Sequence, residues 1–354
     1  MAEKHVVRFE PVGIEIEVGE EQNILRAAQE QGIMLMHGCK EGQCASCKSF
    51  ILEGDDIEHD RYSTFALPDY ELEEGYTLLC RAHAFSDLEV ELLNYDEEML
   101  KSGVPIQTAT TEVAEIEPLT HDISRLTVKL VDPPEMAFNP GQYVDITIPG
   151  TETTRAFSMA NTPSKDDRLE FMIKIYPDGR FSSLLKNDLK VGDTLEVKGP
   201  YGVFVMRHHS DSDLIFIGGG AGMAPIWSLL TAMAEDGTKR KATYFYGART
   251  RKDLFYFDEL QELTRRLENF EFVPALSEPQ PDDDWDGETG LITDVVDRHV
   301  DDLSEHEAYL CGPPPMIDAA ISTLQGKGCG EARIFFDKFT TTASEEEQES
   351  GRIG

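Results

Sequence analysis

The sequence has no apolar run that approaches the roughly 18–20 residues required by a membrane-spanning helix. Its opening residues, MAEKHVVRFEPVG, include no apolar stretch of the signal-peptide type. Basic residues are also scarce, because 32 Lys and Arg stand against 67 Asp and Glu among 354 residues, a formal net charge of −35. A surface this acidic repels nucleic-acid phosphates and anionic lipids. These absences predict a soluble, cytoplasmic protein that binds neither nucleic acid nor membranes.

Cysteine is scarce too, but three of the six cysteines, Cys39, Cys44 and Cys47, fall within nine residues. Such crowding in a chain without an export signal predicts a metal site rather than disulfides. Cys80 follows Cys47 after 32 intervening residues. The spacing C-x4-C-x2-C…C is that of plant-type ferredoxins, so the four thiolates are predicted to hold a [2Fe–2S] cluster. Zinc is the alternative, although it favours paired C-x2–4-C knuckles. Cys329 has no cluster partner and is interpreted as structural.

The N-terminal quarter of the chain is an acidic module. Residues 1–98 hold 7 basic and 23 acidic side chains, with strand-like runs on either side of a short helix predicted at Asn23–Gly32. Asn94–Pro105 shows neither helical nor strand periodicity and contains Gly and Pro, so a linker is placed within it, at residues 99–105.

After residue 105, the predicted secondary structure changes from strands alone to alternating strands and helices. Residues 106–206 are short strands between turn clusters, interrupted by one helix predicted at Phe181–Leu189, which indicates a barrel or sandwich. Residues 207–340 alternate strands and helices, the pattern of a parallel sheet with helices on both faces. The acidic residues 341–354 are predicted to be a disordered tail.

Two motifs in the barrel-like segment are candidates for nucleotide binding. Arg155, Phe157 and Ser158 are predicted to lie on one face of a strand, offering a charge for a phosphate, a ring for stacking and a donor to a ring nitrogen. Gly179 and Ser182 open the one predicted helix of this segment, and a helix N-terminus attracts a pyrophosphate. Both motifs also have plain structural explanations: a surface Arg beside a core Phe, and a serine cap.

A glycine-rich turn, Gly218–Pro225, follows a predicted buried strand and precedes a helix, where backbone can approach a diphosphate. It departs from the G-x-G-x-x-G fingerprint, and no acidic residue occurs about 20 residues on, at Tyr244–Gly247. A nicotinamide cofactor would therefore use another variant of the fold. Cys311-Gly312-Pro313 ends a later strand, at the edge where parallel sheets bind ligands, although it is also consistent with a rigid turn and a buried thiol.

In this order, the motifs resemble the ferredoxin–flavin–nicotinamide reductases that supply electrons to multicomponent bacterial oxygenases. Cys39–Lys48, Glu73–Arg81 and Ala308–Ala320 especially resemble the reductase components of soluble diiron monooxygenases of the methane, propane and phenol hydroxylase systems, with the propane type favoured. The resemblance implies three domains: a β-grasp plant-type ferredoxin, an antiparallel β-barrel that binds FAD, and a parallel α/β domain that binds NADH.

The resemblance also assigns roles to residues. It makes Cys39, Cys44, Cys47 and Cys80 the cluster ligands. It places Arg155 and the turn of Gly179 and Ser182 at the FAD pyrophosphate, and Phe157 and Ser158 at the isoalloxazine ring. The residues that it places at the nicotinamide nucleotide are Gly219, Gly220, Gly222, Pro225, Cys311, Gly312 and Pro313.

Three residues carry the further implications of the resemblance. Ala221 departs from the usual Thr or Ser, which puts one hydroxyl contact in doubt. In the last strand, Phe339 would cover the flavin ring and Asp337 would lie close to it, so that Cys311, Ser158 and Asp337 are the candidates nearest the reacting atoms.

The choice of cofactor rests on one acidic residue. Relatives that prefer NADPH hold its 2′-phosphate with a Ser-Arg pair, and here Glu278 stands in place of that Arg. Glu278 would repel a phosphate and could accept a hydrogen bond from a free 2′-hydroxyl, so NADH is predicted. Arg249 and Arg251, just after the second strand of this domain, keep NADPH open as an alternative.

The predicted activity is NADH-dependent electron transfer through FAD and the cluster to the diiron hydroxylase component of a hydrocarbon-oxidising monooxygenase. A Rieske ring-hydroxylating dioxygenase is an alternative partner, and a non-enzymatic electron-transfer module without flavin is an alternative of another class. The acidic module 1–98 is predicted to dock on a basic patch of the partner, unless its charge serves only solubility.

Overall fold

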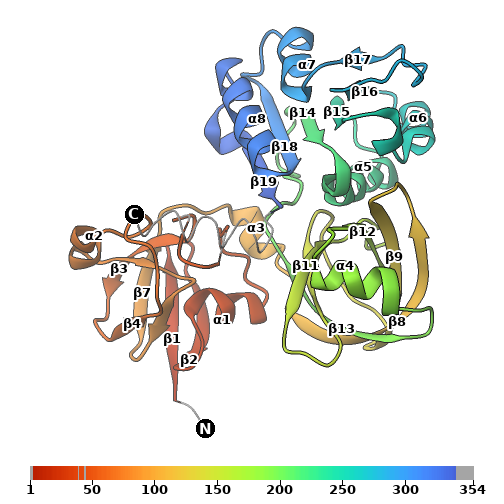
Figure 1. Cartoon of the computed structure of the whole chain (residues 1–354). Coiled ribbons are helices and arrows are strands. Elements are labelled where there is room, and N and C mark those ends of the chain that lie inside the picture. Colours follow the sequence, from red (N-terminus) through yellow and green to blue (C-terminus); the bar gives the residue numbers. More distant parts are fainter. Residues whose placement is uncertain (1–2, 39, 44, 340–354) are drawn as a thin grey trace, which may run out of the picture. The chain divides into compact units, whose positions relative to one another are not determined.

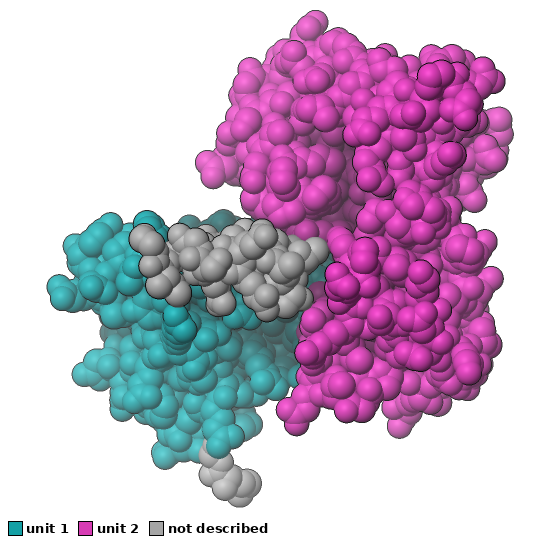
Figure 2. Space-filling view, viewed as in Figure 1, with its two compact units in different colours: residues 1–108, 137–144, 198–209 teal, residues 109–136, 145–197, 210–354 magenta. Residues whose placement is uncertain are grey.

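The computed structural model describes residues 3–38, 40–43 and 45–339, and the predicted tail lies outside them (Figure 1). The chain forms two compact units (Figure 2). The first comprises residues 1–108, 137–144 and 198–209, and the second comprises residues 109–136, 145–197 and 210–354. No helix among the described residues is both long and apolar enough to cross a lipid bilayer.

The N-terminal part is a β-grasp fold. Its elements are β1 (Lys4–Glu10), β2 (Ile14–Gly19), α1 (Ile24–Glu30), β3 (Lys48–Glu53), β4 (Ile57–His59), α2 (Asp69–Glu74), β5 (Tyr76–Leu78), β6 (Ala82–Ala84) and β7 (Leu88–Leu92). Five strands form a sheet in the order β2-β1-β7-β3-β5, in which β1 and β7 are parallel. The predicted helix is confirmed. It begins after Asn23, whose side chain accepts the Arg26 amide, and it ends before Gly32, whose φ of +76° favours glycine.

The middle part is an antiparallel barrel sheet in the order β11-β10-β13-β8-β9-β12. Its strands are β8 (Gln107–Pro118), β9 (Ile123–Asp132), β10 (Tyr143–Thr147), β11 (Thr154–Ser158), β12 (Arg168–Lys174) and β13 (Thr194–Tyr201). An isolated bridge between Met159 and Phe171 brings the two edge strands together, so the sheet is nearly closed. The predicted helix is confirmed, although only its first part is α-helical: α4 covers Arg180–Ser183 and continues as a π-helical turn, Leu184–Asp188.

The C-terminal part is a parallel sheet in the order β17-β16-β15-β14-β18-β19. Its elements are β14 (Asp213–Gly218), α5 (Met223–Asp236), β15 (Ala242–Ala248), α6 (Phe257–Arg266), β16 (Phe270–Leu276), β17 (Glu288–Thr289), α7 (Ile292–His299), β18 (His306–Gly312), α8 (Pro314–Gly326) and β19 (Ile334–Lys338). Alternate residues of the strands pack beneath α7 and α8, among them Ile215, Phe245 and Leu310. The order reverses beside β14, which is the place where such sheets bind nucleotides.

The predicted linker is partly helical, because α3 spans Glu97–Lys101. Asp96 caps this helix and pairs with Arg207, whose side chain is only 3% exposed, at 3.2 Å. The Gly and Pro residues that suggested a linker lie after α3, and the capping Asp was not recognised as a helix signal. The domain boundaries inferred from the sequence remain predictions.

Candidate functional site

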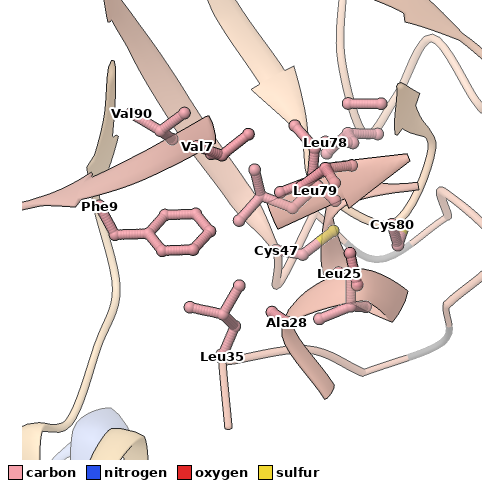
Figure 3. Close-up of a cluster of buried hydrophobic side chains, with 14 of the residues drawn as sticks. Val7, Phe9, Leu25, Ala28, Leu35, Cys47, Leu78, Leu79, Cys80 and Val90 are labelled. Carbon is pink, nitrogen blue, oxygen red and sulfur yellow. The ribbon is translucent and has the colours of Figure 1, made fainter. Parts of the chain in front are cut away.

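The cysteine loop lies at the edge of the ferredoxin-like core. Cys47 and Cys80 are both buried in the cluster that contains Leu25 and Leu79 (Figure 3). The Leu79 amide donates to the Cys47 carbonyl at 3.2 Å, which holds the two cysteine segments side by side. Cys39 and Cys44 lie outside the described residues.

The loop backbone suits a cluster of inorganic sulfide and thiolates. Lys40, Gly42 and Ala45 all have positive φ, and alternating left-handed residues turn backbone N–H groups towards a common anion. A Cβ on Gly42 would lie 2.7 Å from Tyr62 Cβ and 2.9 Å from Arg81 Cγ. Because glycine has no Cβ, the loop can pack directly on Tyr62 and Arg81. The described part of the loop therefore fits the [2Fe–2S] group that its cysteine spacing predicts.

The flavin motif lies on β11. Phe157 is half-buried, with its ring centroid 4.6 Å from that of Phe181 in α4 and 6.4 Å from that of Phe171 in β12. Arg155 has the same strand parity as Phe157, but Ser158 has the opposite parity and is buried at the end of the strand. The expectation that all three side chains share one face is thus wrong for Ser158, because successive strand residues point to opposite faces.

The turn before α4 is tight. The Ser182 hydroxyl accepts the Tyr176 amide at 3.0 Å, and a Cβ on Gly179 would lie 2.8 Å from that hydroxyl. Ser182 therefore closes the turn with its side chain. It does not cap the helix, because the N-cap of α4 is Gly179 and no side chain makes a capping hydrogen bond there, so the serine-cap explanation is wrong. Packing of Phe181 on Phe157 brings this turn to the strand that carries Arg155.

A cleft of about 470 Å³ opens at the carboxyl ends of β14, β15 and β18. The predicted residues that line it are Gly219, Gly220, Gly222, Gly312, Pro313 and Phe339. Gly220 has a φ of +57°, and a Cβ on Gly219 would lie 2.1 Å from the Gly247 carbonyl oxygen. This close packing of backbone on backbone is what the glycines permit. Pro225 is buried in the first turn of α5.

The floor of the cleft joins β14 to β18 and β19. A Cβ on Gly222 would lie 2.3 Å from the Cys311 carbonyl oxygen. Cys311 itself is fully buried, and this burial, with the nearby Asp337 carboxylate, raises the pKa of its thiol well above the usual value. The Phe339 amide donates to the Gly312 carbonyl at 2.9 Å, which fixes Phe339 at the cleft.

The barrel contributes a wall that the sequence reasoning missed. Asp122 and Ile123 at the start of β9, with Lys174 and Tyr176 after β12, line the same cleft. Asp122 pairs with Lys174 and lies 3.8 Å from Arg249. No motif marks these residues, because they reach the cleft only through packing of the barrel on the parallel sheet.

Arg249 lines the same cleft, and its exposed side chain is paired with carboxylates. It donates to Asp253 at 2.9 Å. Burial opposes ionisation of Asp253, but hydrogen bonds from Thr250 and Arg249 outweigh it and lower the pKa of that carboxyl. The exposed Glu278 also acts on Arg249, which has a raised pKa, and the Glu278 amide donates to the Arg249 carbonyl at 2.8 Å.

A ferredoxin-like cysteine loop, a barrel with a flavin motif and a nucleotide cleft in one chain define an iron–sulfur flavoprotein oxidoreductase. Three families match in that order: the 2Fe-2S iron-sulfur cluster binding domain over residues 7–84, the oxidoreductase FAD-binding domain over 110–206 and the oxidoreductase NAD-binding domain over 216–321. The cofactors are thus NADH, FAD and a [2Fe–2S] cluster.

Whole-chain relatives narrow the class. The propane 2-monooxygenase reductase component of Rhodococcus jostii RHA1 is 52% identical over 98% of this chain and 94% of its own length. The toluate 1,2-dioxygenase electron transfer component of Pseudomonas putida is 31% identical over 96% and 97%. The crystal structure of the Amycolatopsis cytochrome P450 reductase GcoB covers 95% of this chain and 99% of its own, with a TM-score of 0.83 and 28% identity. The chain belongs to the ferredoxin-type reductase components of multicomponent monooxygenases.

The close approach at the cleft floor makes Gly222 a sensitive position. We expect Gly222→Ala to push β18 away from the glycine turn and to slow flavin reduction by NADH about tenfold or more, because small misplacements of a reacting group are costly. Stopped-flow measurement of flavin bleaching tests this. Gly326→Ala is the control, since its Cβ meets nothing within 4 Å, and equal rates for both variants would contradict the prediction.

Proposed function

We propose that this chain is the reductase component of a propane-type hydrocarbon monooxygenase. It takes electrons from NADH in the cytoplasm and delivers them to a diiron hydroxylase partner. The observation that carries the proposal is the 52% identity over nearly the whole chain to a reductase component named for that system, together with a nucleotide cleft built jointly by barrel and parallel sheet.

The three cofactors supply the chemistry: FAD accepts a hydride from NADH, and the cluster passes on electrons singly. The protein supplies binding and orientation. Gly219, Gly220 and Gly222 give the NADH pyrophosphate access to backbone, and Gly312, Pro313 and Phe339 border the nicotinamide end of the cleft. Arg155, Phe157 and the turn at Gly179 hold FAD.

The residues proposed nearest the reacting atoms play different parts. The neutral, buried Cys311 shapes the cleft floor from beneath rather than reacting as a thiolate. Asp337 pairs in register with Cys311 at the end of β19. Ser158, buried at the end of β11, supports the strand that carries Phe157 and offers its polar groups to the flavin.

We infer that Glu278 and its neighbours enforce the preference for NADH. The cationic side chain that could hold a 2′-phosphate, Arg249, is surrounded by Asp122, Asp253 and Glu278. A phosphate dianion brought there would meet three carboxylates and one cation that is already paired. A free 2′-hydroxyl meets no such repulsion.

We further infer that the hydroxylase docks beside the cysteine loop. Phe65 is 90% exposed, and the Ser63 amide two residues before it donates to the Gly42 carbonyl of that loop at 3.0 Å. Next along the chain, α2 exposes Tyr70 among acidic residues. An exposed aromatic residue within an acidic surface is suited to anchor a partner with a basic rim.

A dioxygenase partner is the second candidate, supported by the 31% identity to the toluate 1,2-dioxygenase electron transfer component. The 52% identity to a propane monooxygenase component favours the first candidate. A module without flavin is disfavoured, because residues 110–206 match the FAD-binding family and lie between the matches to the iron–sulfur and NAD-binding families.

The electron path predicts a separable defect when one cluster ligand is removed. Cys47→Ser should abolish NADH-driven cytochrome c reduction and hydroxylase turnover, since the cluster is lost, but should retain ferricyanide reduction, which draws electrons from the flavin. Iron content and both activities are measured in parallel. Cys329→Ser is the control, because that buried thiol lies against the His306 carbonyl in the NAD-binding domain. Retention of cytochrome c reduction by Cys47→Ser would refute the path.

The charge arrangement around Arg249 predicts a change in cofactor preference. Glu278→Arg should lower KM for NADPH by roughly tenfold or more, because it replaces a repelling charge by an attracting one. KM for NADH should change little. Glu271→Gln, at the opposite end of β16, removes an equally exposed carboxylate and should leave both constants unchanged. An unchanged NADPH constant for Glu278→Arg would count against the role of Glu278.

The docking surface predicts sensitivity to salt and to one side chain. Reductase-driven hydroxylase turnover should fall as ionic strength rises, because charges separated by more than about 10 Å are screened at 0.1 M salt. Phe65→Ala should raise the hydroxylase concentration required for half-maximal turnover by roughly tenfold. Val191→Ala removes a 66% exposed side chain from a barrel turn and is the control. If turnover changed neither with ionic strength nor in Phe65→Ala, this surface would not be the docking site.

A further inference from the structure

One cation of the cysteine loop contacts the flavin barrel directly. Lys40, immediately after Cys39, places its Nζ 4.2 Å from the ring centroid of Tyr201 and 4.8 Å from that of Tyr143. The two rings lie 5.6 Å apart, inclined by 32°. Tyr143 is the first residue of β10 and Tyr201 the last residue of β13, and all three residues belong to the first compact unit. The ammonium group is thus placed against two aromatic faces.

The tyrosine pair is held in place for this contact. Gly202 has a φ of +99°, and a Cβ there would lie 3.0 Å from Tyr143 Cδ1, so the Tyr143 ring rests on the Gly202 backbone. Tyr143, Tyr201 and Lys40 are all half-buried, which limits screening of the cation–ring attraction by salt.

The chain that leads into the loop rests on the same part of the barrel. Met34 and Met36 pack with Met99, Val203 and Val205. A small cavity of about 20 Å³ beside them is lined by residues of both parts, including His37, Gln142 and Tyr201. Apolar packing of Met34 and Met36 and the cation–ring contact of Lys40 therefore hold the described parts of the loop on the same part of the barrel.

We propose that Lys40 is a positioning residue for electron transfer between flavin and cluster. Clamped by Tyr143 and Tyr201, it fixes the cluster loop on strands β10 and β13, and β10 pairs with β11, the strand of the flavin motif. Each transfer oxidises the flavin by one electron and reduces the cluster by one, and its rate falls steeply with the separation of the two groups. A clamp on Lys40 restricts movement of the cysteine loop relative to the strand ends that carry Tyr143 and Tyr201.

The nature of the contact explains why a lysine serves here. Residues 1–98 carry far more acidic than basic side chains. If Lys40 were held by a carboxylate, many other carboxylates nearby could compete for it, and its position would not be fixed. The two inclined rings of Tyr143 and Tyr201 offer the ammonium group a site made of aromatic faces. The clamp therefore gives a specific position within a surface that is otherwise suited to docking of an external partner.

The test compares holoprotein variants by stopped flow. Lys40→Met should slow flavin-to-cluster transfer at least about threefold, while bleaching of the flavin by NADH keeps its rate, because the loss of one half-buried cation–π contact loosens the loop by about that factor. Lys40→Arg keeps the cation and should restore the rate. Lys101→Met removes an exposed lysine of α3 and is the control. A wild-type transfer rate in folded, fully loaded Lys40→Met would overturn the proposal.

A second arm separates the clamp from a mere charge effect on the cluster. Tyr201→Leu and Tyr143→Leu leave the Lys40 charge in place and should slow the same step; normal transfer in both, with FAD content intact, overturns the clamp. A readout other than activity is hydrogen–deuterium exchange of residues 34–43 and 198–205, which should rise in Lys40→Met and not in Lys101→Met. Failure of NADH to bleach the flavin in the wild type would instead refute the electron path itself.

Discussion

The nucleotide cleft and the cysteine loop both depend on glycines whose backbone lies so close to neighbouring atoms that a Cβ would not fit. At the nicotinamide cleft, Gly219 lies against the Gly247 carbonyl and Gly222 against the Cys311 carbonyl. These contacts bring the ends of β14, β15 and β18 together into one floor. At the other end of the electron path, Gly42 lets the cysteine loop close on the segments around Tyr62 and Arg81. We propose that both sites bind anionic groups through backbone amides, which are more accessible where side chains are absent.

The surface is mostly negative, and two cations on it are held in different ways. The excess of carboxylates over the chain keeps most of the surface negative, and a partner with basic residues would be drawn to it. Two cations, Arg249 and Lys40, differ in the kind of group that holds them. Arg249 is neutralised by Asp122 and Asp253, whereas Lys40 lies on aromatic rings. We infer that the first arrangement disfavours an additional phosphate, and the second holds the cysteine loop on the ends of β10 and β13 through aromatic rings.

Combining three cofactor domains in one chain solves a chemical mismatch. NADH gives up two electrons at once, and an iron–sulfur cluster accepts one, so a flavin is needed between them. The transfer from flavin to cluster is intramolecular, and we propose that it depends on how the described part of the cysteine loop is held. Apolar packing by Met34 and Met36 and the contact of Lys40 with Tyr201 hold the loop on either side of Cys39.

The sequence by itself indicated the cofactors, because their motifs are short: Cys39 to Cys47, Arg155 to Ser158 and Gly218 to Pro225 each fall within a few residues, and only Cys80 is distant. It also determined the three-part fold class, because strand and helix periodicities differ between the parts. Only the tertiary structure placed Asp122 and Lys174 at the cleft, paired Arg249 with carboxylates and set Lys40 against Tyr143 and Tyr201. Such contacts join residues that are distant along the chain, and no local pattern records which of them will meet.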